Sequence, residues 1–338
     1  MVVKSRGLAV APATRPDRAP SDAPPAAATS PSPRPDEYLY LTGRPRMRDL
    51  VRFARSHAVT PPDEPALVAA WQSAHERVRR LETEEAGLPD DPPMRPLGSK
   101  YEPLLIELFR DPLVRDGFNA VPTDVAFVEL DRLVVYQKHI DLTYVRQLAS
   151  SLAGGGRRGR TPSDEQVFRT CLLHDHDEAP VKWSRVQHDR FVFVSPSNDL
   201  RFLGAAPLQR DQIKDYPARG KFVGLVGIAV GLGSNFLNAV YAEKRLVLNN
   251  GSHRAYALRQ LGVTHVPCII QHCASRDEVD AVAATEVRKN PDIYLKDPRP
   301  SMLRDYFDPA LHLVMPVYRR LRQVTVRFEI EENAVPAL

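Results

Sequence analysis

The sequence predicts an α+β protein, and three observations lead to this class. Apolar residues recur at three- and four-residue spacing in the first third of the chain, as in amphipathic helices. Runs rich in β-branched residues dominate from about residue 122 onward, as expected for strands. With 43% hydrophobic and 26% charged residues, the 338-residue chain has an ordinary globular composition and is long enough for one large or two ordinary domains.

The first element to consider is a tail. Eight of the 31 prolines, together with eight alanines, lie in residues 1–36. Such a composition cannot bury enough apolar area to offset the entropy of ordering the chain. We predict a disordered tail over residues 1–36, with a targeting signal or a partner-binding arm as the alternative.

Residues 37–121 are predicted to be a helical N-terminal region. Apolar stripes indicate one helix over 44–57, a second over 67–81 and a third over 101–118. Proline clusters separate them, because proline ends helices and sets loops.

Residues 122–300 are predicted to form the main domain. It begins with a strand and turn over 125–136 and a helix over 141–152, for which Asp141 is the N-cap. A strand-rich insertion follows at about 155–245. The strands predicted within it and at its end are 167–173, 181–186, 190–194, 200–203, 222–230, 236–241 and 245–248.

The second half of this domain returns to helices. A helix is predicted over 252–261 with Gly262 just beyond its end, then a strand over 266–270 and a helix over 276–287. Residues 301–338 are predicted to pack on the core as a helix over 309–321 and a strand over 324–330.

Charge and cysteine content exclude several classes. The 46 Lys+Arg against 42 Asp+Glu give a net charge of +4, which argues against a broad nucleic-acid or membrane coat. No apolar stretch approaches the roughly 18 residues of a transmembrane helix, and no signal-peptide core is present. Three cysteines form no disulfide framework. We expect a cytoplasmic protein with reduced thiols.

Charged clusters elsewhere in the sequence are candidate metal or nucleic-acid sites. His174-Asp-His-Asp-Glu178 has metal-binding residue types, but its position between two predicted strands favours a solvated hairpin loop. Arginines at 44–52 and 157–160 could contact DNA, although solvated surface is the default. The loop Gly231–Asn235 could line a ligand site. No metal site is predicted.

The most informative segment is the junction at Gly251. A strand over 245–248 runs through Asn249, Asn250 and the glycine directly into a helix. At such a junction the first backbone N–H groups of the helix are unpaired and its dipole favours an anion. The expected guest is a phosphate. The alternative is that Ser252 simply caps the helix and Arg254 makes a surface ion pair.

This segment resembles a known family. Gly251-Ser-His-Arg254, followed by Ala257-Leu258, Gly262 and Val266-Pro267, is similar to the G-x-[HR]-R…A…G…[VI]-P signature of the ParB/sulfiredoxin-like superfamily. Residues 127–133 and the helix at Asp141 resemble its opening strand, turn and helix. The resemblance implies that phosphates of ATP, ADP or CTP bind at the junction. The nucleotide-binding candidates are Asn249, Asn250, Gly251, Ser252, His253 and Arg254.

Departures from the family pattern argue against several activities of that family. Sulfiredoxins carry a catalytic cysteine where this chain has Ser252, and a hydroxyl cannot replace that thiolate. Only 38 residues follow Pro300, too few for the DNA-binding domain of chromosome-partition relatives. The acidic positions of the free-serine kinases align with Asn250 and Gln137, which are amides.

The catalytic candidates are therefore Glu129 and Asp131, as substitutes for those carboxylates, and His253. The first hypothesis is a nucleotide-dependent phosphotransferase or NTPase acting on an unknown small-molecule acceptor, with Mg²⁺ held mainly by phosphate oxygens. The second is a non-catalytic nucleotide-sensing or DNA-associated module. The third, a ParB-like nuclease, lacks an identifiable metal-carboxylate cluster.

Overall fold

The computed structural model describes residues 35–152, 161–173, 180–197, 199–209, 212, 224–233 and 235–336. The predicted tail lies outside the described residues except for Pro35 and Asp36, and Asp36 already belongs to a strand. The His174–Glu178 cluster and the arginines of 157–160 also lie outside them. The described part of the chain is a mixed α+β fold, as predicted.

A five-stranded sheet with the order β10-β9-β11-β3-β2 forms the centre of the fold. β11 runs parallel to β9 and antiparallel to β3, so the two motif-bearing segments of the sequence are neighbours in this sheet. Its strands are β2 (Met94–Pro96), β3 (Thr123–Glu129), β9 (Asn238–Ala242), β10 (Arg245–Asn250) and β11 (His265–His272).

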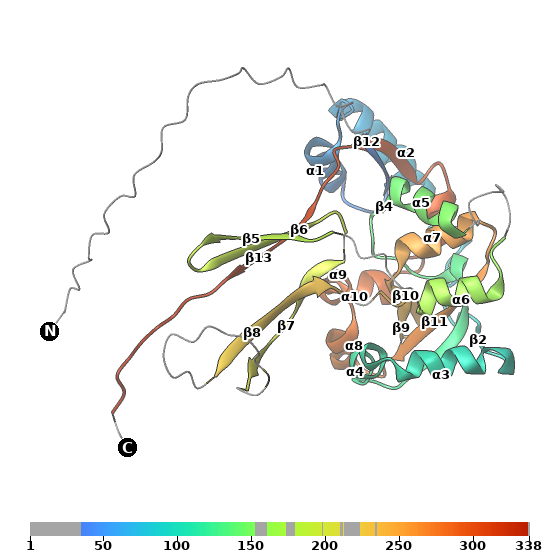
Figure 1. Ribbon diagram of the computed structural model, residues 1–338. Helices are drawn as coiled ribbons and strands as arrows, with labels where there is room; N and C mark the ends of the chain where they lie inside the picture. Colours follow the sequence, from blue (N-terminus) through green and yellow to red (C-terminus); the bar gives the residue numbers. More distant parts are fainter. Residues whose placement is uncertain are drawn as a thin grey trace, which may run out of the picture. The chain divides into compact units, whose positions relative to one another are not determined.

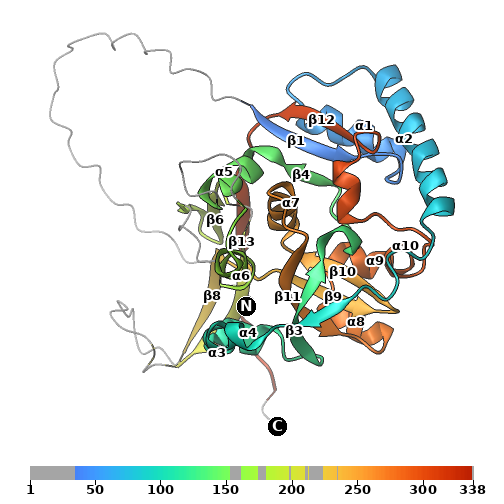
Figure 2. The ribbon, with the colours of Figure 1, turned by 90° about the vertical axis from the view of Figure 1, so that its right-hand side faces the viewer.

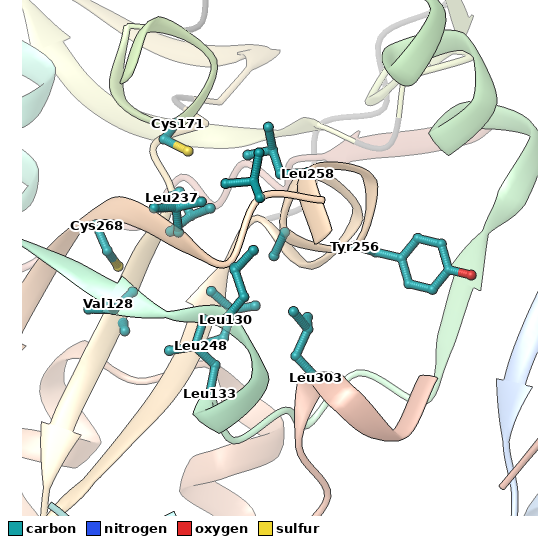
Figure 3. Packing of buried hydrophobic residues seen from close by; sticks show 14 of the residues in the cluster. Val128, Leu130, Leu133, Cys171, Leu237, Leu248, Tyr256, Leu258, Cys268 and Leu303 are labelled. Carbon is teal, nitrogen blue, oxygen red and sulfur yellow. The ribbon is translucent and has the colours of Figure 1, made fainter. Parts of the chain in front are cut away.

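A second sheet, with the order β12-β1-β4, lies on the other side of helix α7 (Ser252–Gln260) (Figure 2). Its strands are β1 (Asp36–Leu41), β4 (His139–Asp141) and β12 (His312–Val317). α7 is buried between the two sheets, because one apolar cluster joins Leu39 and Ile140 to Leu248 and Leu258. Figure 3 shows part of this packing around Leu258, with Cys171 and Cys268 beside it.

Two groups of the remaining helices cover the outer faces of the sheets. α1 (Met47–His57) and α2 (Glu64–Glu84) pack on the second sheet through a separate apolar cluster. α8 (Arg276–Val282), α9 (Thr285–Lys289) and α10 (Pro291–Leu295) cover the face of the central sheet opposite α7. The others are α3 (Glu102–Arg110), α4 (Pro112–Gly117), α5 (Leu142–Leu152) and α6 (Asp164–Leu172).

Two smaller sheets come from the insertion and the C-terminal segment (Figure 1). One has the order β13-β6-β5 and contains β5 (Lys182–Gln187), β6 (Arg190–Ser195) and β13 (Arg322–Arg327). The other is a two-stranded ribbon of β7 (Leu200–Leu208) and β8 (Leu225–Leu232). The insertion is strand-rich, as predicted.

The predicted strand at 167–173 is wrong, because this segment is helix α6. Ser163 and Gln166 form a capping box that starts the helix, and Phe168 and Cys171 are fully buried in the core. The S-x-x-Q signal was present in the sequence, but the run of buried side chains imitates a strand. α6 is therefore part of the core rather than of a separate insertion.

The predicted helix at 309–321 is also wrong, since residues 312–317 form strand β12. β12 pairs antiparallel along the whole length of β1, which itself lies in the region predicted to be helical. Residues 37–121 thus contain β1 and β2 as well as helices. For β1 and β12 the reason is tertiary, because each is specified by a partner 273 positions away in the register Tyr40↔Leu313.

Candidate functional site

The junction between β10 and α7 has the geometry that the sequence predicted. Gly251 is the N-cap of α7 and adopts the left-handed conformation, with φ +100°. A Cβ atom at this position would lie 3.1 Å from Leu237 Cγ and 3.2 Å from Arg254 Nη2. Glycine is needed here both for the backbone conformation and for the close approach.

The N-terminus of α7 carries no side-chain cap within the described residues. The first helical hydrogen bond runs from Ala255 N to Gly251 O at 2.8 Å, so the amides of residues 252–254 precede the hydrogen-bonded ladder. The first turn contains no acidic residue, and Ser252 is buried. The alternative in which Ser252 caps the helix is therefore wrong. In the described part of the chain no side chain caps these amides, and the positive end of the helix dipole lies here.

The guanidinium of Arg254 is buried beside the Gly251 turn, where its Nη2 lies 3.2 Å from the position of a Cβ added to the glycine. The side chain of Arg254 is fully buried, and Nη1 donates to Thr170 O at 3.0 Å and to Cys171 O at 3.2 Å. These carbonyls belong to the last turn of α6, the negative end of its dipole. Nη2 donates to Asn235 Oδ1 at 2.7 Å. Arg254 thus caps α6 while its Nη2 stays beside Gly251, and its burial excludes the surface ion pair.

Asn249 is engaged in holding the junction to α8 and α9. Its side-chain amide donates to Asn238 Oδ1 at 3.0 Å and to Val282 O at 3.2 Å. Its Oδ1 accepts from Ala284 N at 2.7 Å. Its three side-chain hydrogen bonds indicate a structural role.

Asn250 lies half-buried at the junction itself. Its Nδ2 donates to Asn235 Oδ1 at 3.3 Å, the same oxygen that accepts from Arg254. Asn235 Nδ2 in turn donates to Asp199 Oδ2 at 3.2 Å. A hydrogen-bonded chain of polar groups therefore connects the junction to a carboxylate of the insertion.

His253 lies beside the second sheet, where its Nε2 is buried and has no hydrogen-bond partner among the described residues. Its ring packs edge-on against Tyr144 of α5, with ring centroids 5.7 Å apart. Burial, together with charge repulsion by His139 and Arg254, lowers the pKa of His253 to about 4. The imidazole is neutral at physiological pH, so Nε2 is available as a donor or acceptor for a ligand.

Glu129 and Asp131 lie at the opposite end of α7. Asp131 forms a bidentate ion pair with Arg259, with N–O distances of 2.7 and 3.0 Å. Arg259 follows Ser252 by seven residues, roughly 10 Å along the helix. Glu129 is paired in register with His265, beyond the same C-terminal end. The structure therefore does not bring either candidate carboxylate to the Gly251 junction.

A pocket of about 480 Å³ opens near this opposite end. Its walls combine apolar side chains such as Phe127 and Val167 with polar groups at the rim. The N-terminus of α6 contributes Asp164, which pairs with Lys100 at 2.5 Å. This hollow is separate from the junction and contains none of the predicted site residues.

Sequence reasoning missed Asp199 and Tyr144, which the fold brings toward the junction. Both interact electrostatically with the buried Arg254. Asn235 belongs to the glycine-rich loop that the sequence suggested as a possible ligand lining. No sequence motif marks Asp199 or Tyr144. The insertion and helix α5, to which they belong, come near the junction only through the tertiary fold.

Within the described ranges, no group of three or more His, Cys, Asp or Glu side chains could hold a metal ion. No helix among them is long and apolar enough to cross a membrane. Comparisons with protein-family models, with curated proteins and with solved structures gave no match. The site must therefore be interpreted from its own geometry.

Proposed function

We propose that this chain is a nucleotide-binding protein similar to the ParB/sulfiredoxin-like superfamily, with the phosphates of ATP, ADP or CTP at the N-terminus of α7. The observation that carries the proposal is the uncapped, carboxylate-free first turn of α7 next to the buried, unpartnered Nε2 of His253. The neighbouring positions of β3 and β11 support it, because both motif segments then contribute to one sheet.

The N-terminus of α6 provides a contrast within the same molecule. It has the same length of nine residues, yet it is closed by the Ser163–Gln166 capping box and carries Asp164 and Glu165 in its first turn. The capping box satisfies backbone amides at the start of α6, and the two carboxylates repel an anion. α7 lacks both features in the described residues. Of these two helix ends, only that of α7 is suited to bind phosphate.

The residues present fit a phosphate through backbone amides rather than through an arginine. Amides of residues 252–254, Nε2 of His253 and Nδ2 of Asn250 are the donors at the junction, while Arg254 serves α6. Tyr144, a residue that is 36% exposed, offers an aromatic ring on which a base can stack. Mg²⁺, if bound with the nucleotide, would be held mainly by phosphate oxygens and would neutralise their charge.

Our first candidate activity is a phosphotransferase or NTPase reaction with an unidentified small-molecule acceptor. Phosphoryl transfer needs a group that orients the acceptor hydroxyl or water. Glu129 and Asp131 are at the wrong end of α7 for this role, whereas Asp199 is linked to Asn250 through Asn235. We propose Asp199 as that carboxylate and the cytoplasm, where nucleotides are available, as the location.

A second candidate is a sensing module that binds nucleotide without turnover, alone or associated with DNA. The amides at Asn250 and Gln137, where kinase relatives have carboxylates, favour it. A measurement of nucleotide turnover, with and without candidate acceptors such as free serine, separates the two. Substitution of Asp199 by Asn should abolish turnover and leave nucleotide binding within about threefold if the enzyme proposal is right.

Binding is tested by calorimetric titration of ATP, ADP and CTP with Mg²⁺ against the wild type and His253→Phe. The phenyl ring preserves packing against Tyr144 but removes the buried nitrogen. We expect about tenfold weaker binding together with equal or higher thermal stability at pH 8, because an unsatisfied buried polar atom is removed.

Asp131→Asn is the matched control at the other end of the same helix, and it should leave affinity unchanged. Absence of binding for all three nucleotides would refute the proposal. Equal loss of affinity in both variants would indicate a general structural effect instead of a contact at the junction.

A further inference from the structure

The β7–β8 ribbon exposes apolar side chains that the proposed function does not explain. Its two strands pair with each other and with no further strand among the described residues. Figure 1 shows the ribbon projecting from the body of the fold. A two-stranded ribbon alone is marginally stable in water, whereas three or more strands with an apolar face are stable.

One face of this ribbon is wholly apolar. The register places Phe202 opposite Val230, Ala205 opposite Ile228 and Pro207 opposite Val226, and directly opposed residues share a face. We call these six residues the apolar face. Its side chains are unusually accessible: Val226 is 71% exposed, Phe202 56% and Ile228 41%. An accessible apolar patch of this kind is typical of an interaction surface.

The other face is covered by the ribbon itself. A Cβ atom on Gly227 would lie 3.0 Å from Leu208 Cδ1, and one on Gly231 would lie 3.1 Å from Leu203 Cδ1. The two leucine side chains therefore lie over glycines of β8. Only the apolar face lacks such cover from within the ribbon.

The two edges of the ribbon differ in their protection against further pairing. β7 carries Arg201, a register shift between Phe202 and Gly204, and Pro207. A charge, a bulge and a proline are the devices that natural edge strands use to prevent pairing. β8, with the sequence Leu-Val-Gly-Ile-Ala-Val-Gly-Leu, has no charged residue and no proline. β8 is the edge that is open to another strand.

We propose that the β8 edge pairs antiparallel with β8 of a second copy of this chain, about a two-fold axis. The pairing creates a four-stranded sheet β7-β8-β8-β7 and joins the two apolar faces into one. A second copy fits because an isologous contact uses the same edge of both partners, and β8 presents no charge that would repel β8 of the other copy. The eight residues of β8 offer an edge about 24 Å long.

The test measures the oligomeric state of the full chain by sedimentation velocity up to about 100 μM. We expect a reversible dimer for the wild type. Ile228→Lys places a charge near the middle of β8 and should raise the dimer dissociation constant about tenfold or more. Ala205→Lys is the matched control, because Ala205 is the cross-strand partner of Ile228 on the same face but belongs to β7. It should change the constant by about twofold at most.

Three results would overturn the proposal: a monomeric wild type at every concentration, equal dissociation by both lysine variants, or a dimer that both variants leave intact. The second would assign the contact to the apolar face in place of the β8 edge. Amide hydrogen exchange of the wild type provides a test without substitutions. Protection of β8 amides should rise with protein concentration while that of β2, an edge strand of the central sheet, stays constant.

Discussion

The two ends of α7 are treated differently by the same fold. At the C-terminal end, Gly262 has φ +86°, its N–H donates to Arg259 O at 3.0 Å, and Val263 N donates to Leu258 O at 3.0 Å. Asp131 then binds Arg259 with both carboxylate oxygens. The last carbonyls of the helix are satisfied by the chain itself.

At the N-terminal end, the described residues provide Gly251 but no capping side chain, and Nε2 of His253 stays unpartnered. Both ends use a left-handed glycine, yet only one end is completed. The difference between the two ends of α7 shows that a glycine in the left-handed conformation does not by itself indicate a binding site. What distinguishes the candidate site is the set of donors that the protein leaves for another molecule.

The largest contrast should come from the two arginines of α7. Besides Arg254, Leu237 N donates to Cys171 O, and Asn250 Nδ2 donates to Asn235 Oδ1. Arg254→Met removes three buried hydrogen bonds, and it leaves Thr170 O without its donor among the described residues. We expect it to lower the free energy of unfolding by about 4 kcal/mol, as measured by urea denaturation.

Arg259→Met is the matched control, since the side chain of Arg259 is one-third exposed and its ion pair is screened by water. It should cost about 0.5 kcal/mol. Similar losses for the two variants would show that Arg254 does not act as the cap of α6.

Acid should destabilise the N-terminal end selectively. Burial lowers the pKa values of both His253 and His139 to about 4 from an ordinary 6.5, with repulsion by His139 added at His253 and repulsion by His57 added at His139. The unfolded chain therefore binds more protons than the folded one between pH 6.5 and 4, and stability falls as the pH decreases through this window. Each histidine accounts for on the order of 3 kcal/mol at pH 4.

His253→Phe should remove the part of this acid-induced loss of stability that comes from His253. Melting temperatures measured from pH 8 to pH 4 should fall less steeply for the variant than for the wild type. Arg259→Met should follow the wild-type profile, because it changes no group in this pair. Parallel profiles for wild type and His253→Phe would show that His253 titrates normally in the folded protein.

Most helices, and the strands β3, β9, β10 and β11 of the central sheet, could be predicted because their signals are local. Asp141, for example, accepts a hydrogen bond from Tyr144 N at 3.0 Å as the expected N-cap of α5. β1 and β12 could not be predicted, because each depends on a partner distant in sequence. α6 was missed because five of its last six residues are buried, which obscures the helical alternation of apolar and polar residues.

Within the site, the junction could be predicted but the direction of its side chains could not. The G-x-H-R pattern places Gly251 correctly at the start of α7. The contacts of Arg254 depend on α6, because its Nη1 donates to Thr170 O, which lies 84 residues earlier in the sequence. Asp131 was misplaced for the same reason, as its partner Arg259 lies 128 residues later.

The smallest predicted contrast compares the two glycines. An alanine at Gly251 must adopt φ +100° and approach Leu237 at 3.1 Å, whereas at Gly262 no heavy atom lies within 4 Å of the added Cβ. We expect Gly251→Ala to cost about 2 kcal/mol and Gly262→Ala about 1 kcal/mol in urea denaturation, since both share the backbone strain but only one meets a neighbour.

Nucleotide titration adds a second readout to the same pair. Gly251→Ala disturbs the turn that presents the first amides of α7, so affinity should fall several-fold at temperatures where the variant is fully folded. Gly262→Ala leaves those amides in place and should bind like the wild type. If both variants bound nucleotide equally well, the open end of α7 would not be where the phosphates lie, and the difference between its two ends would have a purely structural cause.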